Sequence, residues 1–270
     1  MNNPAGDGGE RVAAFFDLDK TIIARSSTLA FGRPFFQSGL INRRAVLRGA
    51  YAQLMYMWSG ADAEQMDRMR THIIALCAGW HVDQVRSIVD ETLHDIVNPL
   101  VYKEATELIE QHREQGHDIV VVSASGDELV GPIAELVGAT HSVGSRATVR
   151  DGRYTGEMEF YCAGEAKAEA ARRLAAEHGY RLENCHAYSD SVADLPLLTA
   201  VGHPTVVNPD RALRREAASR GWPVLSFTDP VSLRSRIPTP SGAVVAAAVG
   251  LGAAAAVGAA WYGLRRRKRS

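Results

Sequence analysis

RVAAFFDLDKT, residues 11–21, carries the strongest structural signal in the chain. Its apolar part, from Val12 to Phe16, is short and rich in aromatic residues, which predicts a buried β-strand. Asp17 and Asp19 follow at once, with one residue between them. Because an unpaired charge is costly to bury, two carboxylates have no structural use inside such a strand. We therefore expect both at its carboxyl end, where they serve chemistry.

Strand-like and helix-like segments alternate over the rest of the chain. Further apolar runs typical of buried strands lie at residues 117–125, 185–191, 204–210 and 222–227. A hairpin is predicted over residues 147–160, with its turn at Asp151-Gly152. Helical spacing occupies residues of about 101–115, 128–138, 164–179 and 192–202. This alternation predicts an α/β fold, with a Rossmann-like parallel sheet and helices on both of its faces.

One long segment departs from the alternation. Residues 28–98 show helical spacing without a convincing strand, which predicts an all-helical module, called the cap below, inserted after the first strand. The core then comprises residues 11–27 and 99–229. Residues 1–10 are polar and Gly-rich and predict a disordered N-terminus, and residues 230–242 predict a linker.

The end of the chain is apolar and then basic. Residues 243–264 are 22 residues without a charge, and about 20 apolar residues span a bilayer. They predict a transmembrane-type helix, followed by a basic tail at residues 265–270. A buried Ala-rich helix and a helix lying on the membrane surface are the alternatives. Because no signal peptide is visible, we expect a single-pass anchor that holds the domain at the cytoplasmic face of the plasma membrane.

Composition excludes few classes of function. The chain has 270 residues, of which 46% are hydrophobic and 23% charged, as in an ordinary globular protein. A formal net charge of −1 gives no reason to expect nucleic acid as a partner. The three cysteines are odd in number and form no CxxC pair, which argues against a disulfide framework and against a zinc site. A reducing, cytoplasmic compartment is the simplest interpretation.

Further polar residues follow the predicted strands. Ser123 closes the strand of residues 117–125, and Asp190 closes that of residues 185–191, with Asp194 one helical turn later. Lys167 lies near the start of a predicted helix. Ligands of an open parallel sheet bind outside the carboxyl ends of its strands, so we expect these groups to converge with the paired aspartates on one crevice.

The chemistry of these groups is coherent. Carboxylate oxygens suit Mg²⁺, which takes only a few protein ligands. Lys167 is a cation, and Thr21 and Ser123 offer hydroxyl groups, so all three suit the oxygens of a phosphoryl group. Asp17 is placed to attack phosphorus. Asp19, two residues on along an extended chain, lies on the same side and can exchange protons with the leaving alcohol and with water.

With these residues the chain resembles the haloacid dehalogenase superfamily of phosphohydrolases, in its phosphoserine-phosphatase-like branch, over about residues 11–228. The family's first motif, DxDxT, is matched by residues 17–21. The later motifs are matched by Ser123, by Lys167 and by the pair Asp190 and Asp194, although Ser189 stands where a glycine is common.

The resemblance implies a role for each matched residue. Asp17 would be the nucleophile and Asp19 the general acid and base. Mg²⁺ would be held by Asp17, by the backbone carbonyl of Asp19 and by Asp190. Ser123 and Lys167 would hold phosphoryl oxygens, and Asp194 would orient Lys167 or the waters of the metal. Without the resemblance, Asp190 and Asp194 could equally be helix caps.

The chain departs from phosphoserine phosphatases at one position. Ser26 stands where they carry a glutamate that meets the ammonium group of the substrate. A serine supplies no charge, so we expect another small phosphorylated metabolite or a lipid-related phosphate as the substrate. Phosphoserine phosphatase activity proper, or a membrane-tethered binding or regulatory protein of the same fold, are the alternatives.

Overall fold

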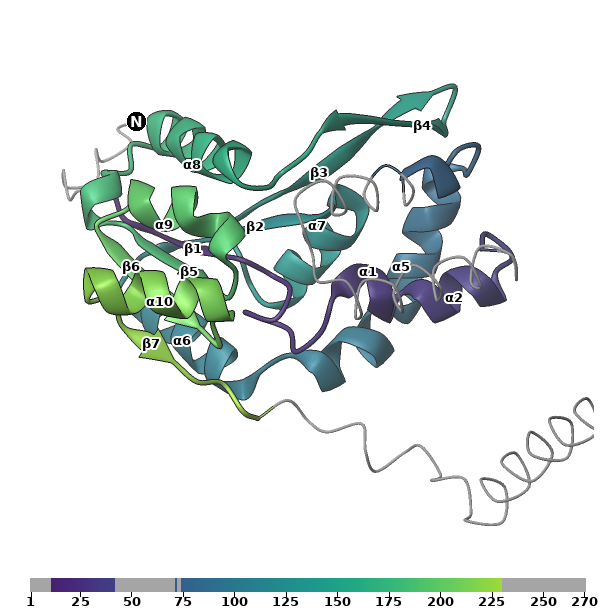
Figure 1. Cartoon of the computed structure of the whole chain (residues 1–270). Coiled ribbons are helices and arrows are strands. Elements are labelled where there is room, and N and C mark those ends of the chain that lie inside the picture. The colour runs from purple at the N-terminus through teal and green to yellow at the C-terminus, as the bar shows by residue number, and fades with distance from the viewer. Residues whose placement is uncertain (1–10, 42–70, 72–73, 230–270) are drawn as a thin grey trace, which may run out of the picture. The chain divides into compact units, whose positions relative to one another are not determined.

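The computed structural model describes residues 11–41, 71 and 74–229. They fold around a seven-stranded sheet with the order β4-β3-β2-β1-β5-β6-β7, shown in Figure 1. Neighbouring strands run parallel, except that β3 and β4 are antiparallel. The predicted α/β fold is confirmed as a mostly parallel sheet flanked by helices.

The strands coincide with the predicted apolar runs to within a few residues, apart from β3, which begins earlier than expected. They are β1 (Ala13–Phe16), β2 (Asp118–Gly126), β3 (His141–Arg150), β4 (Arg153–Phe160), β5 (His186–Ser189), β6 (His203–Val207) and β7 (Val224–Leu225).

The helices between them include three short 3-10 turns among the described residues. The helical elements are α1 (Ser27–Ala30), α2 (Gly32–Gln37), α5 (Val82–Val97), η1 (Asn98–Leu100), α6 (Lys103–Glu114), α7 (Asp127–Leu136), α8 (Glu165–His178), η2 (Leu182–Asn184), η3 (Val192–Asp194), α9 (Leu195–Ala200) and α10 (Arg211–Arg220).

Strand β1 lies inside the sheet because its side chains are apolar on both faces. Phe15 packs in a core cluster with α8, α9 and α10, and Phe16 packs on the opposite face with α5, α6 and α7. Figure 1 shows α8, α9 and α10 together on one side of the sheet. Burying a phenylalanine side chain stabilises the fold by about 1.5–3 kcal/mol, so both phenylalanines favour this central position.

The hairpin β3–β4 turns where the sequence predicts. Asp151 and Gly152 both have positive φ, of 50° and 72°, as a two-residue turn of type I′ requires. Beyond the prediction, the hairpin also pairs with the segment just before α5. The amide of Gly79 donates to the carbonyl of Tyr154 at 2.8 Å, and the amide of Val82 donates to the carbonyl of Gly152 at 3.0 Å.

The described part of residues 28–98 contains α1, α2 and α5. The division of the chain into an inserted cap and a core in two parts stays a prediction. The expected N-terminus, linker and basic tail, residues 1–10, 230–242 and 265–270, lie outside the described residues.

One prediction is wrong. Among residues 11–41, 71 and 74–229, no helix is long and apolar enough to cross a membrane, and this contradicts the expected anchor at the cytoplasmic face of the plasma membrane. The expectation rested on the uncharged composition of residues 243–264 alone, a segment that lies outside the described residues.

Candidate active site

The predicted site residues gather at the carboxyl end of the central strands. Asp17 follows β1 directly, and its amide extends the ladder by donating to the carbonyl of Tyr188 on β5 at 2.9 Å. Ser123 lies within β2, and Asp190 follows β5. Parallel pairing of β1 with both neighbours therefore brings these strand ends to one edge, as the topology rule predicts.

Lys167, in the first turn of α8, connects two of the carboxylates. Its Nζ lies 2.5 Å from Oδ1 of Asp17 and 2.7 Å from Oδ2 of Asp194. The three residues are only 2%, 6% and 4% exposed. Charge-assisted hydrogen bonds of this kind are short and strong, so they hold the Asp17 carboxylate in one orientation.

Asp194 shows that the helix-cap interpretation is wrong for this residue. It occupies the N-cap position of α9, but its side chain makes no capping hydrogen bond. Its Oδ2 accepts instead from Lys167 and from the hydroxyl of Ser189, at 2.7 Å each. Ser189, at the position where a glycine is common in the resembled family, thus holds Asp194 toward Lys167.

The buried charges do not balance. Asp17, Asp190 and Asp194 are buried carboxylates, whereas Lys167 is the one buried ammonium group in the described part of the chain. Burial raises the pKa of Asp17 to about 8, although Lys167 opposes this. Burial likewise raises the pKa of Asp190 to about 6, against the pull of exposed Lys20, whose Nζ is 3.9 Å away.

For the pKa of Lys167 the neighbouring charges outweigh burial, whereas for the pKa of Asp17 and Asp190 burial outweighs the neighbouring charges. Burial disfavours the charged form of Lys167, but the carboxylates of Asp17 and Asp194 outweigh this effect and raise its pKa. The site therefore keeps its ammonium charge and holds carboxylates in excess. A divalent cation that prefers oxygen ligands fits this donor set.

Asp19 points toward the start of α1. Lys20 has φ of 62°, a left-handed conformation that turns the chain sharply after β1. Oδ1 of Asp19 accepts the amide of Ser27 at 2.9 Å, and Oδ2 accepts the hydroxyl of Ser125 at 3.2 Å. Both oxygens are thus held by hydrogen bonds, one from each of the two predicted segments of the core, residues 11–27 and 99–229.

Ser125 and Ser27 were missed by sequence reasoning. Beyond its bond to Asp19, Ser125 accepts the hydroxyl of Ser27 at 2.7 Å and donates its amide to the hydroxyl of Ser123 at 3.2 Å. The available signal in the sequence was Ser125, the second serine of the SAS triplet at residues 123–125. This signal was not sufficient, because Ser125 comes near Asp19 only through the pairing of β1 with β2.

Asp210 is a second residue that sequence reasoning missed. Its amide donates to the carbonyl of Asp190 at 2.7 Å, and its carboxylate accepts the amides of Val192 and Leu213 at 2.9 and 2.7 Å. It therefore caps α10 and fixes the loop that carries Asp190. An aspartate before a helical segment was the available signal.

Two further predicted residues have weaker contacts. Thr21 is fully buried, and its hydroxyl donates to Oδ2 of Asp17 at 3.5 Å. Ser26 lies half-buried at the N-cap of α1, where its side chain makes no capping hydrogen bond. A side-chain cap of α1 is therefore not the reason that a serine stands at this position.

Comparison with known proteins is consistent with this geometry. Residues 14–199 match the model of the haloacid dehalogenase-like hydrolase family. A relative from Mycobacterium tuberculosis (strain ATCC 25618 / H37Rv), named "Probable phosphatase Rv3661", is 66% identical over 95% of this chain and 90% of its own length. The same organism's phosphoserine phosphatase SerB1 is 33% identical over 90% of this chain and 80% of its own length.

A third relative, a histidinol-phosphatase from Neisseria meningitidis serogroup C (strain 8013), is 30% identical over 79% of this chain and 98% of its own length. Among solved structures, a protein of unknown function from Bordetella pertussis Tohama I has a TM-score of 0.69 at 28% identity, covering 80% of this chain and 98% of that one.

A structure of the phospho-aspartyl intermediate analogue of phosphoserine phosphatase has a TM-score of 0.58 at 20% identity, covering 82% of this chain and 95% of that one, and so shares the fold. The family model spans well over half of the chain, and relatives match it almost end to end. The chain therefore belongs to the haloacid dehalogenase-like hydrolases, in their phosphoserine-phosphatase-like branch, and is an enzyme of the phosphatase class.

Proposed function

We propose that the chain hydrolyses a phosphomonoester through an aspartyl-phosphate formed on Asp17. The observation that carries this proposal is the buried contact between Asp17 and Lys167, with Asp19 held two residues away by its own hydrogen bonds. These contacts support Asp17 as the nucleophile, Lys167 as the phosphate-binding cation and Asp19 as the proton carrier, all at the carboxyl ends of the strands.

Asp17 carries out the first step. One carboxylate oxygen attacks phosphorus, the bond from phosphorus to the leaving oxygen breaks, and the phosphoryl group stays on Asp17. Lys167 and the hydroxyls of Ser123 and Thr21 bind the phosphoryl oxygens as charge builds up on them. Asp194 and Ser189 keep Lys167 in place for this task.

Asp19 moves the protons. It donates a proton to the leaving alcohol, and the resulting carboxylate then removes a proton from the water that attacks the aspartyl-phosphate. The hydrogen bonds from the Ser27 amide and the Ser125 hydroxyl position this carboxylate. Ser125 and Ser27 are therefore positioning residues, which act through Asp19.

Mg²⁺ is the cofactor that this site suits. Asp17, the backbone carbonyl of Asp19 and Asp190 would hold it, and the excess of buried carboxylates supports the assignment. When bound, the cation neutralises charge on the phosphoryl group.

The substrate is a small phosphorylated molecule other than phosphoserine. Ser26 lacks the charge that would meet an ammonium group, and it has no capping role in α1. Relatives named for phosphoserine and for histidinol phosphate are consistent with a substrate preference that varies within this branch. The described helices of residues 28–98 would form the cap that selects the substrate.

Phosphate release from a panel of substrates tests this proposal. The panel contains an aryl phosphate, phosphoserine, histidinol phosphate, glycerol phosphate and a lysophospholipid phosphate, each with and without Mg²⁺. We expect Mg²⁺-dependent release, with phosphoserine below the best substrate in kcat/KM, and a relative gain for phosphoserine in Ser26→Glu. A wild-type enzyme that prefers phosphoserine over every other compound overturns the specificity proposal but leaves the mechanism standing. Release that does not depend on Mg²⁺ overturns the cofactor assignment.

A further inference from the structure

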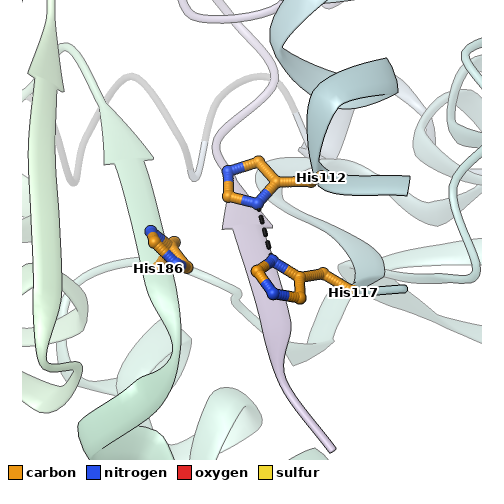
Figure 2. A group of neighbouring side chains, drawn as sticks. All are labelled: His112, His117 and His186. Atoms are coloured by element: carbon orange, nitrogen blue, oxygen red, sulfur yellow. Dashed lines mark hydrogen bonds between the residues drawn. The ribbon is translucent and has the colours of Figure 1, made fainter. Parts of the chain in front are cut away.

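Three histidines lie close together at the opposite ends of the strands from the aspartates. His112 comes from α6, His117 lies in the turn before β2, and His186 is the first residue of β5. Figure 2 shows the rings of His112 and His117 joined by a hydrogen bond, with His186 beside them on a neighbouring strand. Since His117 and His186 precede or begin their strands, the cluster lies at the amino ends of the strands, whereas Asp17 and Asp190 lie at the carboxyl ends.

The spacing of the ring nitrogens is compatible with a shared ligand. One nitrogen from each ring lies within 4.8 Å of the other two. Nδ1 of His112 and Nδ1 of His117 are 2.8 Å apart and share a hydrogen bond, which an ion bound between them would replace. Two ligands of a tetrahedral zinc ion with bonds of about 2.0–2.1 Å are about 3.3 Å apart. To become ligands of one ion, the pair at 2.8 Å has to open and the separations of up to 4.8 Å have to close toward this value.

The second nitrogen of His112 is already engaged. Its Nε2 lies 2.7 Å from the hydroxyl of Tyr188, which is itself buried. A histidine that binds a metal through one nitrogen usually uses the other in a hydrogen bond of this kind, which fixes the tautomer and the ring orientation. His112 is thus oriented as a ligand through Nδ1.

We propose that His112, His117 and His186 form a second metal site, which takes a divalent ion of the zinc class. Three neutral imidazoles favour such ions, whereas Mg²⁺ favours oxygen ligands. His112 donates from Nε2 to Tyr188 and accepts from Nδ1 of His117. On binding, the His117 proton moves to its own Nε2, so both Nδ1 lone pairs face the ion and no net proton is lost. Water completes the tetrahedron.

The surroundings of the cluster agree with this assignment. Burial lowers the pKa of His112 and of His186 to about 4, so both rings are uncharged at neutral pH and protons do not compete for them. His117 and His186 are only half-buried, which leaves a path for the ion from solvent. A bound ion would join α6 to β5 and to the turn before β2.

Zinc binding to the full-length protein, freed of any polyhistidine tag, tests the proposal. Equilibrium dialysis against Zn²⁺ is followed by elemental analysis, with Mg²⁺ in excess to occupy the catalytic site. The variants are His117→Gln and His186→Gln, which spare the buried His112. The matched control is His141→Gln, because His141 stacks on His178 with ring centroids 4.2 Å apart and forms a histidine pair without a third member within the described residues.

We expect one Zn²⁺ per chain in wild type and in His141→Gln, and affinity weakened at least about tenfold in each of the two variants. Binding should persist in Asp190→Asn, where the proposed catalytic metal site is damaged. Zinc should also shift the Nδ1 resonances of His112 and His117 in ¹⁵N NMR. The proposal is overturned if wild type retains no zinc, if both variants bind zinc as wild type does, or if Asp190→Asn abolishes binding.

Discussion

Burial shifts the pKa of titratable groups in opposite directions at the two ends of the parallel strands. We call the carboxyl ends of the strands the carboxyl edge and the amino ends the histidine edge. At the carboxyl ends of the strands, burial raises the pKa of Asp17 and Asp190. At the amino ends, burial lowers the pKa of His112 and His186. Burial disfavours the charged form in both places, but an aspartate then demands a cation while an imidazole is left as a neutral donor. The same fold therefore suits a hard cation at one edge and a softer one at the other.

Removing the nucleophile is the most severe test of this contrast. Asp17→Asn should lower phosphatase turnover to the background of the assay, because a neutral amide does not attack phosphorus. Zinc retention at the histidine edge should stay unchanged, since the edges share no ligand. Phosphate release and dialysis measure the two effects, and Asp83→Asn, at an exposed position on α5, is the control that keeps activity. Wild-type turnover in Asp17→Asn contradicts the aspartyl-phosphate mechanism.

Lys167→Met tests how much the carboxyl edge depends on one ammonium group. The substitution leaves Asp17 and Asp194 buried without their partner, and breaking a buried ion pair costs about 3–5 kcal/mol. His186→Gln, which removes an uncharged ring from the other edge, should destabilise the protein much less. Chemical denaturation without divalent ions compares the two. If Lys167→Met and His186→Gln lower the free energy of unfolding equally, the buried charges at the carboxyl edge do not make it more sensitive than the histidine edge.

Magnesium should stabilise the protein more at pH 8 than at pH 5. The pKa values of Asp17 and Asp190, about 8 and about 6, lie above their ordinary value of 3.8. The folded state thus binds more protons than the unfolded state between about pH 4 and 8, and their contribution to stability falls as pH rises through that window. Mg²⁺ held by the ionised carboxylates, as proposed above, should restore this contribution.

The expected size of this effect follows from mass action. At a hundredfold excess over Kd, ligand binding contributes about 2.7 kcal/mol, which raises Tm by about 5–10 °C for a domain of this size. Differential scanning fluorimetry at the two pH values measures it. Asp190→Asn should lose most of the rise at pH 8. If Mg²⁺ raises Tm as much at pH 5 as at pH 8, ionised carboxylates are not its ligands.

Ser125→Ala should have the smallest effect. Without its hydroxyl, Asp19 loses one of two hydrogen bonds, so we expect kcat to fall about tenfold, the equivalent of one hydrogen bond of about 1.4 kcal/mol. KM should change little, because Ser125 acts through Asp19. Ser125→Thr keeps the hydroxyl and should recover most of kcat. Steady-state kinetics that show a loss in KM alone would assign Ser125 to substrate binding.

The two edges also differ in how far the sequence predicts them. Asp17, Asp19 and Asp190 directly follow apolar runs, so local pattern and the rule for strand ends suffice to predict that they meet. His112, His117 and His186 belong to no motif. Their proximity depends on how α6 packs against β1 and β5, which a single sequence does not specify, and cysteine spacing alone had argued against any zinc site.

Similar limits apply within the fold. The apolar run before Asp17 predicts a buried strand, and the alternation of strands and helices predicts a parallel sheet with helices on both faces; both predictions are confirmed. Ser125 approaches Asp19 only through pairing of β1 with β2, and the contact of β4 with residues 79–82 joins backbone groups that carry no side-chain signal. Membrane insertion was inferred from apolar composition alone, and it is contradicted.

The pairing of β4 with residues 79–82 restricts how α5 can swing relative to the sheet. A rigid rotation of α5 has to break those backbone hydrogen bonds or carry the tip of the hairpin along. The second course requires β4 to bend, and its pairing with β3 is irregular between Tyr154 and Met158, which pair with Val149 and Ala147. Gly156 on β4 has φ of 87°, and an added Cβ would lie 3.0 Å from Cβ of Ala78. The hairpin tip and α5 are thus linked through these backbone hydrogen bonds, and the positive φ of Gly156 disfavours a residue with a side chain at this point of β4.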